Sequence, residues 1–62
     1  MTSIFIAVQD SNPIPCGAKS DEALVCAHAQ DWANYSKRNV HVLRISGPFV
    51  DVAHIVMPKD QP

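Results

Sequence analysis

Charged side chains are scarce in this 62-residue chain, and neither sign of charge dominates. Five Lys and Arg stand against six Asp and Glu, which gives a formal net charge of -1. A nucleic-acid-binding surface needs basic side chains clustered on one face, and only Lys37 and Arg38 are adjacent. Direct binding of nucleic acid is therefore not expected. The hydrophobic content of 47% favours a folded chain over a disordered one.

Long apolar runs and a basic leader are also missing. No stretch approaches the roughly 20 apolar residues that span a bilayer. Residues 1–10 contain no Lys or Arg, and Asp10 comes too early for a signal peptide. We therefore expect a cytoplasmic protein with no membrane partner. Cys16 and Cys26 are then expected to be free thiols, although the sequence does not exclude a disulfide bond between them.

Glycine is nearly absent, and this decides how residues 12–24 are interpreted. The segment NPIPCGAKSDEAL lies between a predicted strand and a predicted helix, as a phosphate-binding loop does. Such a loop requires the spacing G-x-x-x-x-G-K-[ST], but Asn12 occupies the first glycine position and Ala18 separates Gly17 from Lys19. We interpret the segment instead as a proline-stiffened loop that ends at Ser20, the expected N-cap of the helix.

Hydrophobic periodicity predicts an α+β fold with β-α-β-β order. One amphipathic helix of about 17 residues would pack on a three-stranded, mainly antiparallel sheet. The strands are predicted in residues 3–9 and on both sides of Ser46-Gly47-Pro48, and the helix in residues 20–38. Placing the last strand in the middle would make every pairing antiparallel, but the strand order stays open.

The chain length allows one domain and no more. Residues 1–57 are expected to form this domain, and residues 58–62 a flexible C-terminal tail. The last two strands predict a hairpin in which the opposite charges of Arg44 and Asp51 face each other. The same register pairs Ile45 with Val50, Leu43 with Val52, and His41 with His54.

Three histidines are the residues that best suit a metal site. His41 and His54 would pair across the hairpin, and His28 lies toward the apolar side of the helix, so the three could converge as in three-histidine zinc sites. Each lies in an apolar neighbourhood without a carboxylate to orient it. We therefore predict no metal and no cofactor, and keep a histidine-based metal- or ligand-binding regulator as an alternative.

The sequence offers no catalytic group with its partners. Cys16 lies beside a helix N-terminus, but no general base or oxyanion site accompanies it. Asp21 and Glu22 suit the first turn of the helix, and Asp31 lies on its polar side. The chain is therefore not expected to be an enzyme.

The sheet itself offers a surface for a partner. The predicted register turns Leu43, Ile45, Val50 and Val52 toward the helix, which leaves the opposite face half apolar and uncovered. Exposed apolar patches and open sheet edges often mark protein-binding sites. A structural homodimer through the same face is a further alternative. The predicted partner-binding residues are Val40, Val42, Arg44, Phe49, Asp51 and Ile55.

Two segments carry a resemblance to a known family. DEALVCAHAQDW, a helix that opens D-E-A-L, and VHVLRI, a following strand with an arginine, are similar to the small RNA-polymerase inhibitor of podophages. Small anti-CRISPR proteins are similar in size and layout. The resemblance implies a phage or mobile-element inhibitor that binds a host protein complex in the host cytoplasm. Of the family's two functional arginines only one is matched, by Arg44, because Ser46 occupies the second position.

Overall fold

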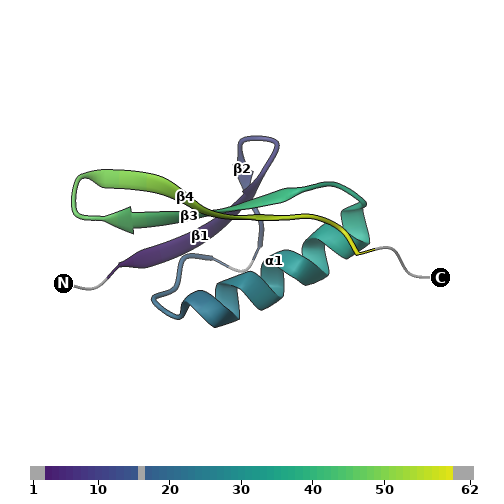
Figure 1. The fold of residues 1–62 in the computed structure, drawn as a ribbon, viewed down its shortest axis with the longest axis horizontal. Coiled ribbons are helices and arrows are strands. Elements are labelled where there is room, and N and C mark those ends of the chain that lie inside the picture. The colour runs from purple at the N-terminus through teal and green to yellow at the C-terminus, as the bar shows by residue number, and fades with distance from the viewer. Residues whose placement is uncertain (1–2, 16, 60–62) are drawn as a thin grey trace.

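The computed structural model describes residues 3–15 and 17–59 as an α+β fold with one helix on an antiparallel sheet (Figure 1). The α+β class and the single helix agree with the prediction, but the sheet has four strands and the order is β-β-α-β-β. The additional strand, β2, contains two residues. The elements are β1 (Ile4–Gln9), β2 (Asn12–Pro13), α1 (Glu22–Ser36), β3 (Val40–Ser46) and β4 (Phe49–Val56).

The segment between β1 and α1 is more than a loop, because it runs back along β1. Asp10 and Ser11 have left-handed φ angles of 53° and 68°, and β2 then pairs with the end of β1. Farther along, Phe5 and Lys19 exchange two backbone hydrogen bonds of 2.7 and 2.9 Å. The chain thus returns to the start of β1 before α1 begins.

This return sets the direction in which β3 runs. Because α1 starts near the beginning of β1, the chain leaves α1 at the opposite end, and β3 enters the sheet antiparallel to β1. The observed order is β2-β1-β3-β4, and every pairing is antiparallel. The arrangement with the last strand in the middle is therefore wrong, since β3 is the central long strand.

The ends of α1 differ slightly from the prediction. Asp21, and not Ser20, is the N-cap, and its carboxylate accepts a hydrogen bond of 3.1 Å from the N–H of Leu24. A carboxylate suits this position because the helix dipole favours negative charge at the N-terminus. At the other end Lys37 adopts a left-handed φ of 62°, and its N–H donates to the Ala33 carbonyl at 2.8 Å.

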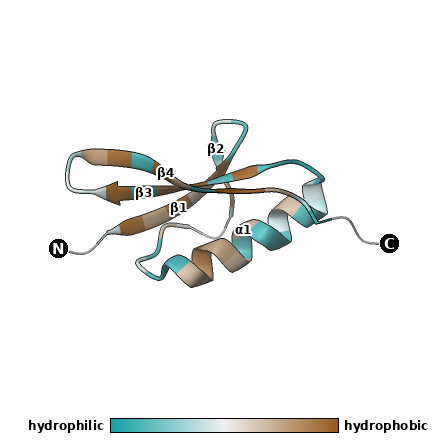
Figure 2. Cartoon of the chain, viewed as in Figure 1, coloured by the Kyte–Doolittle hydropathy of each residue, from teal (hydrophilic) through white to brown (hydrophobic). Residues whose placement is uncertain are grey.

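The core between α1 and the sheet is built mainly of small side chains. Ala7 of β1 and Ala29 and Ala33 of α1 are fully buried, so the helix lies close to the sheet. The largest fully buried side chains are only valines. We call the side of the sheet that α1 covers the inner face (Figures 1 and 2). The buried core consists of Phe5, Ala7, Ile14, Val25, Ala29, Ala33, Val40 and Val42.

The predicted assignment of the sheet faces is wrong for β3 and for Val50 and Val52 of β4, which pair with Ile45 and Leu43 on the side away from α1. Val40 and Val42 are fully buried under α1, whereas Leu43 and Ile45 alternate to the opposite face. Val42 pairs with Ala7, whose small side chain lets the helix approach. Val40 and Val42 therefore have no surface to offer a partner, contrary to the prediction.

The register of the β3–β4 hairpin is confirmed near its turn and wrong farther along. A β-bulge separates the two parts, because one extra residue, Ala53, lies between the residues opposite Leu43 and Val42. Beyond it, His41 faces Ile55, and His54 faces Val42. The bulge thus places His41 and His54 on opposite faces. The confirmed pairs are Ile45–Val50, Arg44–Asp51 and Leu43–Val52.

The segment after β4 contacts α1. The side-chain amide of Gln30 donates to the Met57 carbonyl at 3.0 Å, and the N–H of Lys59 donates to the Asn34 side-chain oxygen at 2.8 Å. The prediction of a flexible tail covers residues 58–62, and its last three positions lie outside the described residues. Cys16, predicted as a free thiol, also lies outside them.

Candidate interaction surfaces

The three histidines do not converge. His54 lies on the inner side, where its Nε2 is 2.6 Å from a carboxylate oxygen of Glu22. His41 lies on the opposite face of the sheet, and His28 is exposed on α1, beside Trp32. Within residues 3–15 and 17–59, no three His, Cys, Asp or Glu side chains are placed to hold a metal ion together.

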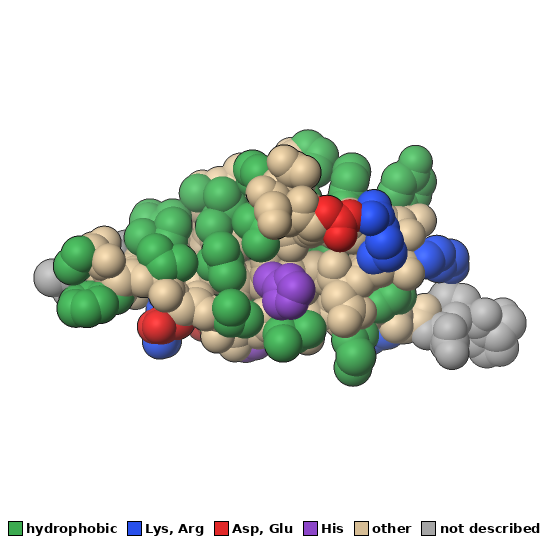
Figure 3. Space-filling view, turned by 90° about the horizontal axis from the view of Figure 1, so that it is seen from above, with side chains coloured by type: hydrophobic (Ala, Val, Ile, Leu, Met, Phe, Trp, Pro, Cys, Tyr) green, Lys and Arg blue, Asp and Glu red, His purple; other side chains and the backbone are tan. Residues whose placement is uncertain are grey.

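The side of the sheet opposite α1, which we call the outer face, presents nine side chains in three rows. Residues directly opposite each other in antiparallel strands share a face, so the pairings define the rows. Figure 3 shows that hydrophobic side chains cover most of this side, with charged side chains toward its ends. The rows are Ile4–Ile45–Val50, Ile6–Leu43–Val52 and Val8–His41–Ile55.

The outer face carries larger side chains than the core. Eight of its nine residues are Ile, Val or Leu, and none is Asp, Glu, Lys or Arg. Val50, Val52 and Ile55 are between 55% and 59% exposed. Soluble monomers rarely expose contiguous apolar patches larger than a few hundred Å². A face of this kind is typical of a surface that another macromolecule covers.

A second surface lies at the end of the β3–β4 hairpin, and we call Arg44, Phe49 and Asp51 the hairpin tip. These residues belong to the inner side of the sheet, but the hairpin extends past the first turn of α1 (Figure 1). A side-chain nitrogen of Arg44 donates to an Asp51 carboxylate oxygen at 3.2 Å, and both side chains are about half exposed. Phe49 is 70% exposed.

The predicted partner-binding residues thus fall into three groups. Arg44, Phe49 and Asp51 lie together at the hairpin tip, Ile55 lies on the outer face, and the two valines of β3 are buried. β4 adds an open edge beside the tip, since it pairs only with β3 in the described part of the chain. Eight of the nine outer-face residues were not among the predicted partner-binding residues. For the three of them on β1, the available signal was the alternation of Ile and Val in residues 4–8.

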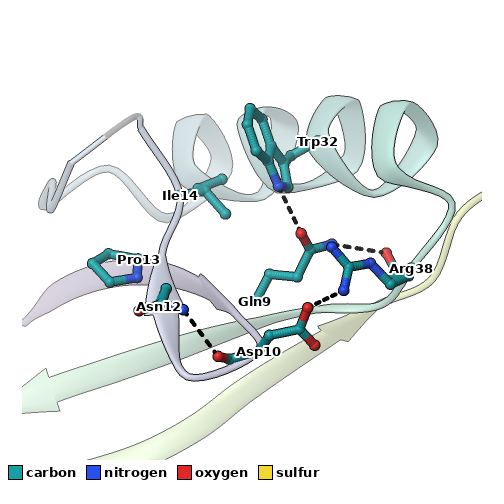
Figure 4. A pocket seen from close by; sticks show the side chains of 7 residues that line it. All are labelled: Gln9, Asp10, Asn12, Pro13, Ile14, Trp32 and Arg38. Atoms are coloured by element: carbon teal, nitrogen blue, oxygen red, sulfur yellow. Dashed lines mark hydrogen bonds and ion pairs between the residues drawn. The ribbon is translucent and has the colours of Figure 1, made fainter.

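A shallow pocket lies between the β1–β2 turn and α1 (Figure 4). Its volume is about 200 Å³, below the range of ordinary small-molecule sites. The buried side chain of Gln9 accepts a hydrogen bond of 2.9 Å from Trp32 Nε1 and donates one of 2.6 Å to Ser36 Oγ. Arg38 forms an ion pair with Asp10 at its rim. These contacts join β1 to α1, so the polar groups of the pocket have a structural role.

Cys26 is a free thiol that packs against the edge of the core. Burial raises the pKa of this thiol, and the nearby negative charge of Glu22 raises it further. A raised pKa keeps the thiol protonated at neutral pH, and the thiolate is the reactive form. Cys26 therefore has the properties of a packing residue.

Comparison with known proteins assigns no relative. No protein-family model matches the chain, and no significant match was found among curated proteins or solved structures. In the part of the chain that the structure describes, no helix has the length and apolar character needed to cross a membrane.

Proposed function

We propose that this chain is a small, non-enzymatic protein-binding module that contacts a foreign protein through its hairpin tip. The observation that carries the proposal is Phe49, a large aromatic side chain that is 70% exposed at the end of a hairpin. Arg44 and Asp51 lie beside it as an exposed ion pair. An apolar anchor next to polar groups that can form hydrogen bonds is the usual composition of a protein-binding hot spot.

The hairpin tip suits this role because its backbone is already ordered. β3 is held between β1 and β4, and the register near the turn is regular. Binding of a partner at the tip therefore costs little conformational entropy, because no loop of this chain has to become ordered on binding. The free edge of β4 can also form backbone hydrogen bonds with an extended segment of the partner.

The resemblance to phage inhibitors supports the class of partner. Arg44, the arginine that matches the family's strand, lies in the hairpin tip, where its side chain is about half exposed. We therefore propose that the module is made by a phage or mobile element, and that its partner belongs to a bacterial host complex in the cytoplasm.

Affinity capture from bacterial lysate tests this function. The tagged chain is compared with Phe49→Ala and with Tyr35→Ala, which removes another highly exposed aromatic side chain from a different surface, on α1. Loss of a hot-spot aromatic weakens binding by about 2 kcal/mol or more, so Phe49→Ala should retain less than about a tenth of the captured partner. Tyr35→Ala should retain most of it.

Two results would contradict the proposal. One is capture of no protein above background by the unmodified chain, and the other is equal capture by both variants. As a functional readout, induced expression of the unmodified chain should slow bacterial growth, and Phe49→Ala should relieve this effect.

A further inference from the structure

A partner at the hairpin tip would not cover the outer face, because the two surfaces lie on opposite sides of the sheet. We propose that a second copy of this chain covers the outer face, so that two four-stranded sheets pack face to face in a homodimer. This inference is independent of the proposed function at the tip. It rests on the composition, the size and the shape of the outer face.

The composition favours self-association. Obligate homodimer interfaces resemble a domain core cut in half, whereas interfaces with foreign partners are more polar and carry about ten hydrogen bonds. The outer face has no Asp, Glu, Lys or Arg, and His41 is its one polar side chain. Two copies can therefore meet without bringing like charges together. A foreign partner would find no salt-bridge group on the face to recognise.

The size of the outer face meets the lower limit for a stable pair. Three of its residues, Val50, Val52 and Ile55, retain more than half of their accessible surface. Nine side chains of this kind present on the order of 500 Å², so two faces would bury about 1,000 Å² in total, where specific interfaces begin. The whole described chain has an accessible surface of 4258 Å², so the pairing would cover a substantial share of it.

The shape of the face also suits a copy of itself. Two sheets with the same twist pack with their strands about 30° apart, and side chains of the facing rows interdigitate. Leu43 occupies the centre of the array, in the middle row of the middle strand. A two-fold axis through the centre of the array would place Leu43 opposite Leu43 of the second copy, with the other eight residues of each face around them.

The small core gives a reason for the pairing. A domain of about 60 residues buries too little surface for high stability, and this core consists largely of alanine and valine around Phe5 and Ile14. Burying the Ile, Leu and Val side chains of the outer face between two copies would add the buried apolar surface that the core of one copy lacks. Oligomerisation is a common way for chains of this size to become stable.

Sedimentation velocity and light scattering of the full chain test the inference. At about 100 µM, a concentration that populates complexes of micromolar affinity, the expected mass is twice the 6.8 kDa of one chain. Val52→Glu places two charges inside the dimer interface, one from each copy, and should weaken dimerisation by about 100-fold or more. Phe49→Glu is the matched control, because it adds the same charge at an exposed site on the other side of β4 and should leave the dimer intact.

An NMR measurement keeps the test decisive if Val52→Glu fails to fold. In a mixed sample of isotope-labelled and unlabelled chains, intermolecular NOEs are expected among the methyl groups of Leu43, Ile45 and Val52. A monomeric unmodified chain at this concentration would overturn the inference, as would a dimer without these NOEs. A monomer that captures a foreign protein through Val52 would assign the outer face to that protein instead.

Discussion

At the scale of single residues, Gln9 connects the two layers of the fold. Its carbonyl oxygen accepts the hydrogen bond of the Trp32 indole, and its amide nitrogen donates to Ser36, so one side chain on β1 holds two positions of α1. A buried amide with its partners arranged in this way fixes the position of the helix along the strand, since a shift of either element breaks a hydrogen bond.

Replacing Gln9 with Leu tests this connection. The substitution leaves the Trp32 N–H in a half-buried site without its acceptor, and an unsatisfied group of this kind costs about 1–3 kcal/mol. We expect urea denaturation to show a decrease of this size in the free energy of unfolding. Asn12→Ala is the control, because it removes an exposed hydrogen bond in the same turn. Equal stability of Gln9→Leu and the unmodified chain would contradict the structural role of the amide.

At the scale of elements, the start of α1 depends on one carboxylate. Asp21 caps the helix and Ser20 does not, although both residue types favour the N-cap. Asp21→Ala should therefore lower the free energy of unfolding by about 1 kcal/mol, and Ser20→Ala should leave it nearly unchanged. Urea denaturation of the two variants measures the difference, and a larger effect at Ser20 would refute the observed cap.

The sequence predicted the long elements and missed the features that depend on tertiary pairing. β1, α1 and the β3–β4 hairpin follow from periodicity and turn residues, and the Arg44–Asp51 pair follows from the register. β2 has only two residues, which is too short for any period to show. The bulge at Ala53 leaves no local mark, because each residue around it is as compatible with a regular strand as with an irregular one.

The assignment of the sheet faces failed for a different reason. Both faces of the hairpin are apolar, so alternation alone could not distinguish the face that α1 covers. The small side chains of Ala7, Ala29 and Ala33 are all fully buried in the one core cluster between the inner face and α1. Such a preference for small side chains under the helix becomes visible only when β1, β3 and α1 are placed together. Arg44, Phe49 and Asp51 are exposed as expected, but they lie on the inner side of the sheet beyond α1 and not on the uncovered face where they were predicted.

At the scale of the whole molecule, a dimer through the outer face couples folding to association. Stability then depends on concentration by mass action. Between about 2 and 200 µM, the Tm of the unmodified chain should rise by about 5 °C or more. The Tm of Val52→Glu should not change over the same range. Calorimetry or circular dichroism measures both, and a Tm of the unmodified chain that is independent of concentration would argue against coupled association.

The position of Trp32 has a practical consequence for separating these two events. It is the one tryptophan of the chain, it lies on α1 against Gln9, and α1 covers the face opposite the outer face. Its fluorescence emission should therefore stay constant when two chains come apart and shift to the red when a chain unfolds. The molecule thus contains an intrinsic optical reporter that responds to the integrity of one chain and not to its association with another.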